Sequence, residues 1–203
     1  LSIPIQVHTR KFVSPINKLT VSLTKKHMTG NLKNYEKLKE AFEKYSDSLI
    51  KTNERRELWK TETKEKIFET LKAIESTFKF DWHVQRLEDI ENYQTINISC
   101  NSKSSGMIET TRDFGTGKVT KSRAYVKYGG YLAFAQSYNG KINVFIKFPY
   151  IEEWVSEMNA EVLDTIEPSQ ITEETISEFV IKFLNKLSKW EGIDRTPLGF
   201  NKE

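Results

Sequence analysis

The sequence predicts an α+β fold with helices placed before and after a run of antiparallel strands. Apolar residues follow a heptad-like spacing in 35–49, period-2 alternation recurs within 80–148, and a wide apolar stripe occupies 176–190. Helices and strands that are segregated along a chain are typical of this class. We expect a single domain over 1–203, composed of an extended basic arm (1–30), a helical hairpin (31–79), an antiparallel sheet (80–149), C-terminal helices (150–192) and a tail (193–203).

Composition restricts the class of protein. The chain has 203 residues, of which 37% are hydrophobic, 12% aromatic and 29% charged, enough for one substantial core. No apolar run approaches the ~20 residues of a membrane span, so we expect none. Cys100 is the sole cysteine, which excludes an intrachain disulfide and fits a reducing compartment. We therefore expect a cytoplasmic protein, or a domain excised from a longer chain because it starts at Leu1.

Charge is distributed unevenly along the chain. Residues 1–35 contain six Lys/Arg and no Asp/Glu, and residues 101–150 contain eight against two. Residues 151–203 instead contain five Lys/Arg against twelve Asp/Glu. This polarity favours either an anionic partner or internal pairing, with acidic segments lying over a basic sheet. The sequence leaves both alternatives open.

The N-terminal part predicts helices after the irregular arm. Asn31 is a candidate N-cap. A first apolar run steps by 3, 4, 3 and 4 residues, and a second run follows it. The first run is Tyr35, Leu38, Phe42, Tyr45 and Leu49, and the second is Trp59, Ile67, Leu71, Ile74 and Phe78. Common helix lengths favour an antiparallel hairpin turning near Asn53 over one helix of almost fifty residues.

Residues 80–149 predict an antiparallel meander of five or six strands. The first strands are expected at 80–88, 93–100 and 107–118, the last with a glycine-containing turn. Asp81 and His83 share a strand parity and could orient a general base. No nucleophile accompanies them, so a structural histidine is the favoured interpretation.

The next strand places three cations and a tyrosine on one face. They are Lys121, Arg123, Tyr125 and Lys127, which alternate with smaller residues. Cations interleaved with an aromatic ring are typical of nucleic-acid binding. They are equally typical of a solvated outer face or a protected edge strand, and charge runs favour the solvated interpretation.

A hairpin is predicted around Asn139-Gly140, taken as the two central residues of the turn. This register sets Ala135 opposite Val144 and Ala133 opposite Ile146 on one face, which we expect to form the core with Val126. It sets Phe134 opposite Phe145 on the other face, which also carries Lys147. These phenylalanines need a cover, either a helix of the same chain or a ligand; the first is favoured.

Two helices are expected after the sheet. Ile151, Trp154, Val155 and Met158 have the spacing of a short amphipathic helix. A long helix follows Thr172, a good N-cap, and ends at Gly192. Its apolar stripe predicts that it packs flat on the sheet; the stripe is Ile176, Phe179, Val180, Phe183, Leu184, Leu187 and Trp190.

No motif indicates a known family, a catalytic centre, a cofactor or a metal site. The sequence therefore favours a non-enzymatic binding or protein-interaction module, with a protein partner or self-association through the helices. The alternative is a nucleic-acid-binding domain that uses a basic-aromatic sheet face. The candidate binding residues are Lys121, Arg123, Tyr125, Lys127, Phe134, Lys141, Phe145 and Lys147.

Overall fold

The computed structural model describes residues 34–154 and 157–193. The chain divides into two compact units, 1–43 and 44–203. The helical elements are α1 (Tyr35–Leu58), the π-helical η1 (Trp59–Thr63), α2 (Lys64–Thr77), the 3₁₀ turn η2 (Pro168–Gln170) and α3 (Glu173–Gly192). The strands are β1 (Trp82–Leu87), β2 (Thr95–Cys100), β3 (Lys103–Arg112), β4 (Val119–Tyr128), β5 (Tyr131–Gln136), β6 (Ile142–Lys147), β7 (Tyr150–Ile151) and β8 (Glu161–Ile166). The α+β class is confirmed.

The first helices are continuous, so the hairpin expected near Asn53 is wrong. Asn53 lies inside α1, and α1 passes through η1 into α2 without leaving helical geometry. No glycine or proline interrupts 35–77, so nothing in the sequence breaks the backbone hydrogen-bonding pattern. The π segment places Trp59 and Thr63 in buried positions, and Thr63 donates a hydrogen bond to the carbonyl oxygen of Pro168 at 3.4 Å.

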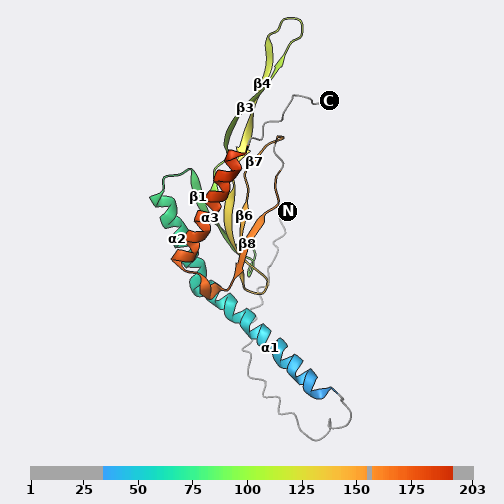
Figure 1. The fold of residues 1–203 in the computed structure, drawn as a ribbon, viewed down its shortest axis with the longest axis vertical. Coiled ribbons are helices and arrows are strands. Elements are labelled where there is room, and N and C mark those ends of the chain that lie inside the picture. The colour runs from blue at the N-terminus through green and yellow to red at the C-terminus, as the bar shows by residue number, and fades with distance from the viewer. Residues whose placement is uncertain (1–33, 155–156, 194–203) are drawn as a thin grey trace, which may run out of the picture. The chain divides into compact units, whose positions relative to one another are not determined.

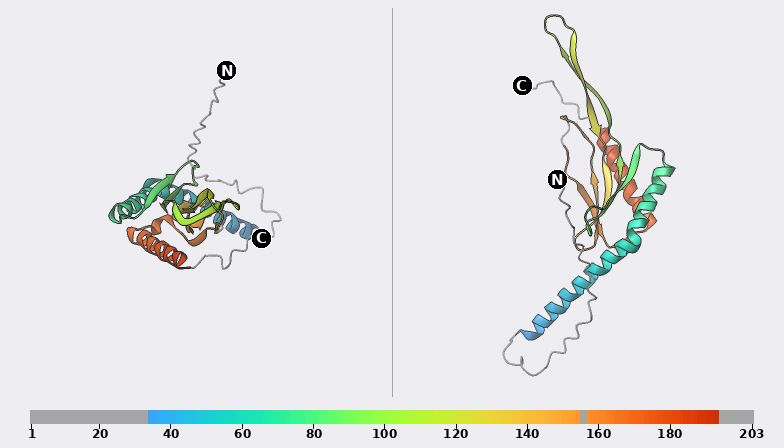
Figure 2. Two further views of the ribbon diagram at one scale, coloured as in Figure 1. Left: turned by 90° about the horizontal axis from the view of Figure 1, so that it is seen from above. Right: turned by 180° about the vertical axis from the view of Figure 1, so that it is seen from behind.

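Within the described residues, eight strands form two antiparallel sheets, where one meander of five or six strands was expected. The larger sheet has the order β1-β2-β5-β6-β8, and the smaller has the order β3-β4-β7. The chain leaves the larger sheet after β2, forms the β3–β4 hairpin, and returns at β5. Beyond its short pairing with β7, this hairpin extends as a two-stranded ribbon, which we call the β3–β4 ribbon (Figures 1 and 2).

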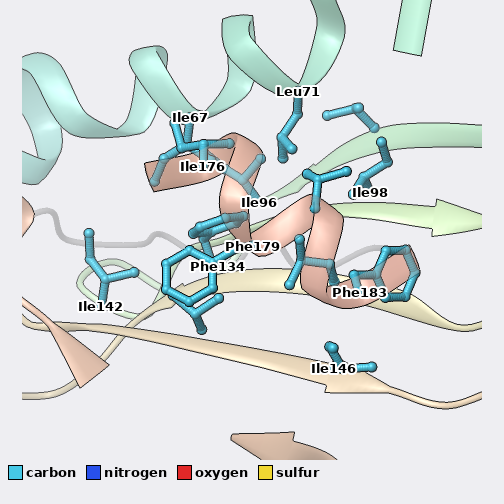
Figure 3. Close-up of a cluster of buried hydrophobic side chains, with 14 of the residues drawn as sticks. Ile67, Leu71, Ile96, Ile98, Phe134, Ile142, Ile146, Ile176, Phe179 and Phe183 are labelled. Atoms are coloured by element: carbon cyan, nitrogen blue, oxygen red, sulfur yellow. The ribbon is translucent and has the colours of Figure 1, made fainter. Parts of the chain in front are cut away.

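The core lies between one face of the five-stranded sheet and helices α2 and α3, which both cover that face (Figure 2). Ile67 and Leu71 enter from α2, while Phe179 and Phe183 enter from α3 (Figure 3). The predicted packing of the last helix on the sheet is confirmed for Val144 and Ile146, which join this cluster. Val126, assigned to the same face, lies in the other sheet.

The hairpin at Asn139-Gly140 forms, but its register differs by one residue from the expected one. Phe134 pairs with Val144 and Ala133 pairs with Phe145. Of the turn residues between β5 and β6, only Gly140 has a positive φ, of 79°, and its amide donates to the carbonyl oxygen of Ser137 at 2.8 Å. The turn is therefore a three-residue loop with a left-handed glycine rather than the two-residue turn. A one-residue shift exchanges the two faces of a strand.

The C-terminal helix begins and ends as predicted. The Thr172 hydroxyl accepts a hydrogen bond from the amide of Thr175, which caps α3, and the helix ends at Gly192. The short helix expected from Ile151 is wrong, because Ile151 belongs to β7 and a turn follows it at Glu152–Trp154. Ile151 pairs with Lys127 of β4, so the backbone stays extended where the apolar spacing indicated a helix.

Some expectations fall outside the described residues. These are the basic arm at 1–30, the helix start at Asn31 and the tail from residue 194. Among the residues that the structure does describe, no helix combines the length and apolar character needed to cross a membrane.

Candidate functional site

The eight candidate binding residues do not form one surface. Four lie on β4 in the three-stranded sheet: Lys121, Arg123, Tyr125 and Lys127. Three lie on β5 and β6 in the five-stranded sheet: Phe134, Phe145 and Lys147. Lys141 lies in the turn between β5 and β6. The basic strand and the two phenylalanines thus belong to different sheets.

Two of the four candidate residues on β4, Arg123 and Tyr125, contact residues that come after β7 in the chain. Tyr125 is only 2% exposed; its ring meets that of Trp154 edge-on at 5.6 Å, and its hydroxyl donates to Glu109 at 3.0 Å. Arg123 donates to Glu153 at 2.9 Å and to Glu152 at 3.1 Å. The Glu153 hydrogen bond raises the pKa of Arg123 further above its ordinary range. Arg123 and Tyr125 are therefore engaged in contacts within the chain.

The remaining cations are also paired, with one exception. Lys127 is buried, forms an ion pair with Glu191 and lies 4.9 Å from the ring centre of Trp190. Lys147 pairs with Glu157 at 2.8 Å, and Lys141 pairs with Glu167 at 3.3 Å. Acidic groups of the C-terminal segment therefore neutralise four of the five candidate cations. In the described chain only Lys121 of the five has no such partner.

The two candidate phenylalanines lie on opposite faces of the five-stranded sheet. Phe134 is fully buried and meets the ring of Phe179 of α3 at 5.9 Å. Phe145 lies on the other face, half-buried, and meets Tyr131 edge-on at 6.2 Å. The cover that the sequence required for Phe134 is thus a helix of the same chain, as favoured.

Asp81 and His83 bond to other residues, in keeping with the favoured structural interpretation of the histidine. The carboxylate of Asp81 accepts a hydrogen bond from the side-chain amide of Asn101 at 2.5 Å. His83 lies opposite Ser99 in the β1–β2 register, with Nε2 3.1 Å from the serine Oγ. A serine and a histidine at this distance need a third group to orient the ring for nucleophilic catalysis. No such hydrogen bond to His83 exists in residues 34–154 and 157–193.

The described part of the chain also contains no cluster of His, Cys, Asp and Glu side chains that could hold a metal ion. Comparisons of the chain with protein-family models, curated proteins and solved structures gave no match.

Two exposed apolar surfaces of the described residues stand apart from these ion pairs. The outer part of the β3–β4 ribbon exposes Ile108, Phe114 and Val119. The sequence predicted a strand and a glycine-containing turn at 107–118, but no exposed apolar surface there. Helix α1 has no buried residue at all. Its apolar run was predicted, and it stays at the surface: Tyr35, Leu38, Phe42, Tyr45 and Leu49. We call these five residues the α1 seam.

Glu167 joins the turn of the β5–β6 hairpin to α1. Its carboxylate accepts from Arg55 at 2.5 Å and 2.8 Å and pairs with Lys141 at 3.3 Å. The hydrogen bond from Arg55 lowers the pKa of Glu167 below its ordinary value of 4.5; partial burial opposes this effect, and Lys141 adds to it. A carboxyl group whose pKa is lower in the folded chain stabilises the fold above its unfolded pKa.

We expect the Glu167 contribution to be present at neutral pH and to be lost as the pH falls below about 4.5. Glu167→Gln should lower the free energy of unfolding at pH 7 by about 1 kcal/mol or less, because the side chains of Glu167 and Arg55 are both partly exposed. Thermal unfolding between pH 7 and pH 3 should show the two melting curves converging at acid pH. Glu174→Gln, at an exposed position of α3, is the matched control. If the melting temperatures of the wild-type and Glu167→Gln chains differed equally at every pH, the ionised Glu167 carboxylate would not be the source of the stability.

Proposed function

We propose that this chain is a non-enzymatic interaction module that binds a protein partner through the α1 seam. One observation carries the proposal: α1 buries none of its 24 residues, although five large apolar side chains recur along it at heptad-like spacing. Leu38 is 59% exposed, Phe42 68% and Tyr45 63%. Exposed apolar side chains gathered on one stripe mark interaction surfaces, whereas scattered ones need no explanation.

The spacing of the seam indicates what kind of partner fits it. Steps of three and four residues keep apolar side chains on one stripe that a second helix covers by knobs-into-holes packing. A second copy of this chain carries the same stripe, and two-fold pairing of identical surfaces is the commonest way in which chains self-associate. Small residues flank the stripe at Ala41, Ser46 and Ser48, which allows two helices to approach closely. We therefore propose self-association through α1.

Replacing Leu38 and Phe42 together with lysine should abolish this association. Each substitution puts a charge where an apolar side chain would be buried, and losing one such burial costs about 1.5–3 kcal/mol. We expect the dimer dissociation constant to rise at least about tenfold, measured by sedimentation equilibrium of the full chain. Helix content measured by circular dichroism should stay unchanged, because neither side chain is buried.

Ile50→Lys is the matched control, because Ile50 lies on the same helix outside the seam and is 46% exposed. It should leave the dissociation constant unchanged. A wild-type chain that remains monomeric up to about 1 mM, where even an association of about −4 kcal/mol is visible, would contradict self-association. Equal weakening by Ile50→Lys would contradict the seam.

No single observation favours nucleic-acid binding over this proposal. Phosphate binding requires cations that are free to replace counterions. Arg123, Lys127, Lys141 and Lys147 already pair with carboxylates, and the β3–β4 ribbon also carries Glu109. These ion pairs within the chain favour a structural role for the basic strand over nucleic-acid binding.

A further inference from the structure

A cavity of about 260 Å³ lies where the β3–β4 ribbon leaves the five-stranded sheet. Its walls come from the α2–β1 connection, the ends of β2 and β4, the start of β3, the β4–β5 connection, the residue before β7 and the last turns of α3. The lining residues that matter here are Phe80, Asp81, Cys100, Lys103, Leu184 and Leu187. The cavity shares no residue with the α1 seam.

Backbone contacts that allow no side chain build one wall of the cavity. A Cβ at Gly129 would lie 1.9 Å from the carbonyl oxygen of Cys100, and a Cβ at Gly130 would lie 2.6 Å from that of Lys147. The amide of Cys100 donates to the carbonyl oxygen of Gly130 at 2.9 Å. The wall is therefore fixed by the chain path and is present before any ligand arrives.

Apolar side chains make most of the remaining wall. Leu187 is buried, whereas Phe80 is 55% and Leu184 38% exposed at the opening. Ligand pockets are lined mainly by apolar groups with a few placed polar ones. An apolar ligand body would cover the exposed surface of Phe80 and Leu184, which supplies the favourable free energy of burial.

The charged side chains at the opening of the cavity differ in whether another side chain binds them. Asp81 accepts from Asn101, and Lys127 pairs with Glu191. Lys103 is the one charged lining residue with no hydrogen bond or ion pair from its side chain in the described chain. It lies directly opposite Lys127 in the β3–β4 register, and Glu191 already neutralises the charge of Lys127. Lys103 is therefore the lining cation that can still pair with an anionic group.

We propose that this cavity binds a small carboxylate with an apolar body, whose head group accepts a hydrogen bond from Lys103 Nζ and whose body lies against Phe80, Leu184 and Leu187. A volume of about 260 Å³ holds about nine non-hydrogen atoms at the ~30 Å³ that a water molecule occupies in the liquid. Aliphatic acids of seven or eight carbons have this size. A charge-assisted hydrogen bond gives the carboxylate its advantage over a neutral or cationic head group.

The sole cysteine supplies a direct readout of occupancy. Cys100 lines the cavity, and burial raises the pKa of its thiol to about 11, so it reacts slowly with a disulfide reagent at neutral pH. We expect octanoate to slow the reaction of Cys100 with Ellman's reagent further, in a saturable manner. Octylamine and 1-octanol at the same concentrations should leave the rate unchanged.

Variants of the full chain separate a carboxylate site from general apolar binding. Lys103→Gln should weaken the protection by octanoate at least about tenfold, the lower bound for losing a charged hydrogen bond. Lys118→Gln, an equal charge change at the ribbon tip, should have no effect. The proposal is overturned if octylamine or octanol protects as well as octanoate, if Lys103→Gln keeps full protection, or if octanoate gives none. Lys103 is exposed, so its substitution should leave the fold intact, which thermal unfolding checks.

Discussion

Phe134→Ala should lower the free energy of unfolding by about 3–5 kcal/mol, the range observed when a buried phenylalanine is truncated. The side chain is fully buried between the five-stranded sheet and Phe179 of α3 (Figure 3). Its removal leaves a cavity that neighbouring side chains fill only in part. For a chain of this size, thermal unfolding should move down by about 6–20 °C.

Phe145→Ala is the matched control, since it removes the same atoms from the neighbouring strand. Phe145 is half-buried on the opposite face, so its loss should stay below about 2 kcal/mol. The comparison also tests the hairpin register, because a two-residue turn at Asn139-Gly140 would place both rings on one face. Equal losses for the two variants would contradict the observed register.

Gly129→Ala should have the second largest effect, a loss above about 3 kcal/mol or failure to fold. Its Cβ would lie 1.9 Å from the carbonyl oxygen and 2.9 Å from the Cβ of Cys100. The obstructing atom belongs to the backbone of β2, so no side-chain rotation relieves the overlap and the strands must separate. Overpacking in a well-packed core usually costs about 1–3 kcal/mol, and a backbone overlap exceeds that range.

Gly192→Ala provides the control for this substitution. No atom lies within 4 Å of a Cβ built at Gly192, and α3 ends at that residue. Chemical denaturation should therefore show no loss of stability. A fully stable Gly129→Ala chain would show that β2 and the β4–β5 connection are farther apart than the structure places them.

The elements whose signals are local were predictable from the sequence. The cap at Thr172, the seven-residue apolar stripe and the final glycine all belong to α3 or its N-cap, and each favours the same helix. Such agreement between propensity, pattern and capping is what specifies an element.

The β5–β6 hairpin shows that sequence signals within a turn do not always determine the turn type and register. Asn-Gly is typical of a two-residue turn, yet Gly140 alone adopts the left-handed conformation. A Cβ at Gly140 would lie 2.7 Å from that of Arg55, so α1 packs against this turn. A contact between residues 85 positions apart is invisible to a pattern within the hairpin.

The candidate site was predictable only as a set of residue types. The sequence indicated basic residues on alternating strand positions, and it left open whether the acidic C-terminal segment neutralises them. Glu152, Glu157 and Glu191 do so from three separate places. The cavity could not be predicted, because segments far apart in the chain meet there and no spacing in the sequence connects Lys103 with Leu184.

The π-helical η1 has a consequence for the whole N-terminal helix. Leu49 and Ile67 are eighteen residues apart, which is five turns of a regular α-helix, so an unbroken helix would put both on one face. The wider turn of η1 amounts to a one-residue insertion and rotates the residues of α1 by about 100° relative to those of α2. Ile67 is buried while Leu49 is exposed. The apolar residues of α1 therefore point in a different direction around the helix axis from Ile67 and Leu71 of α2, which enter the core.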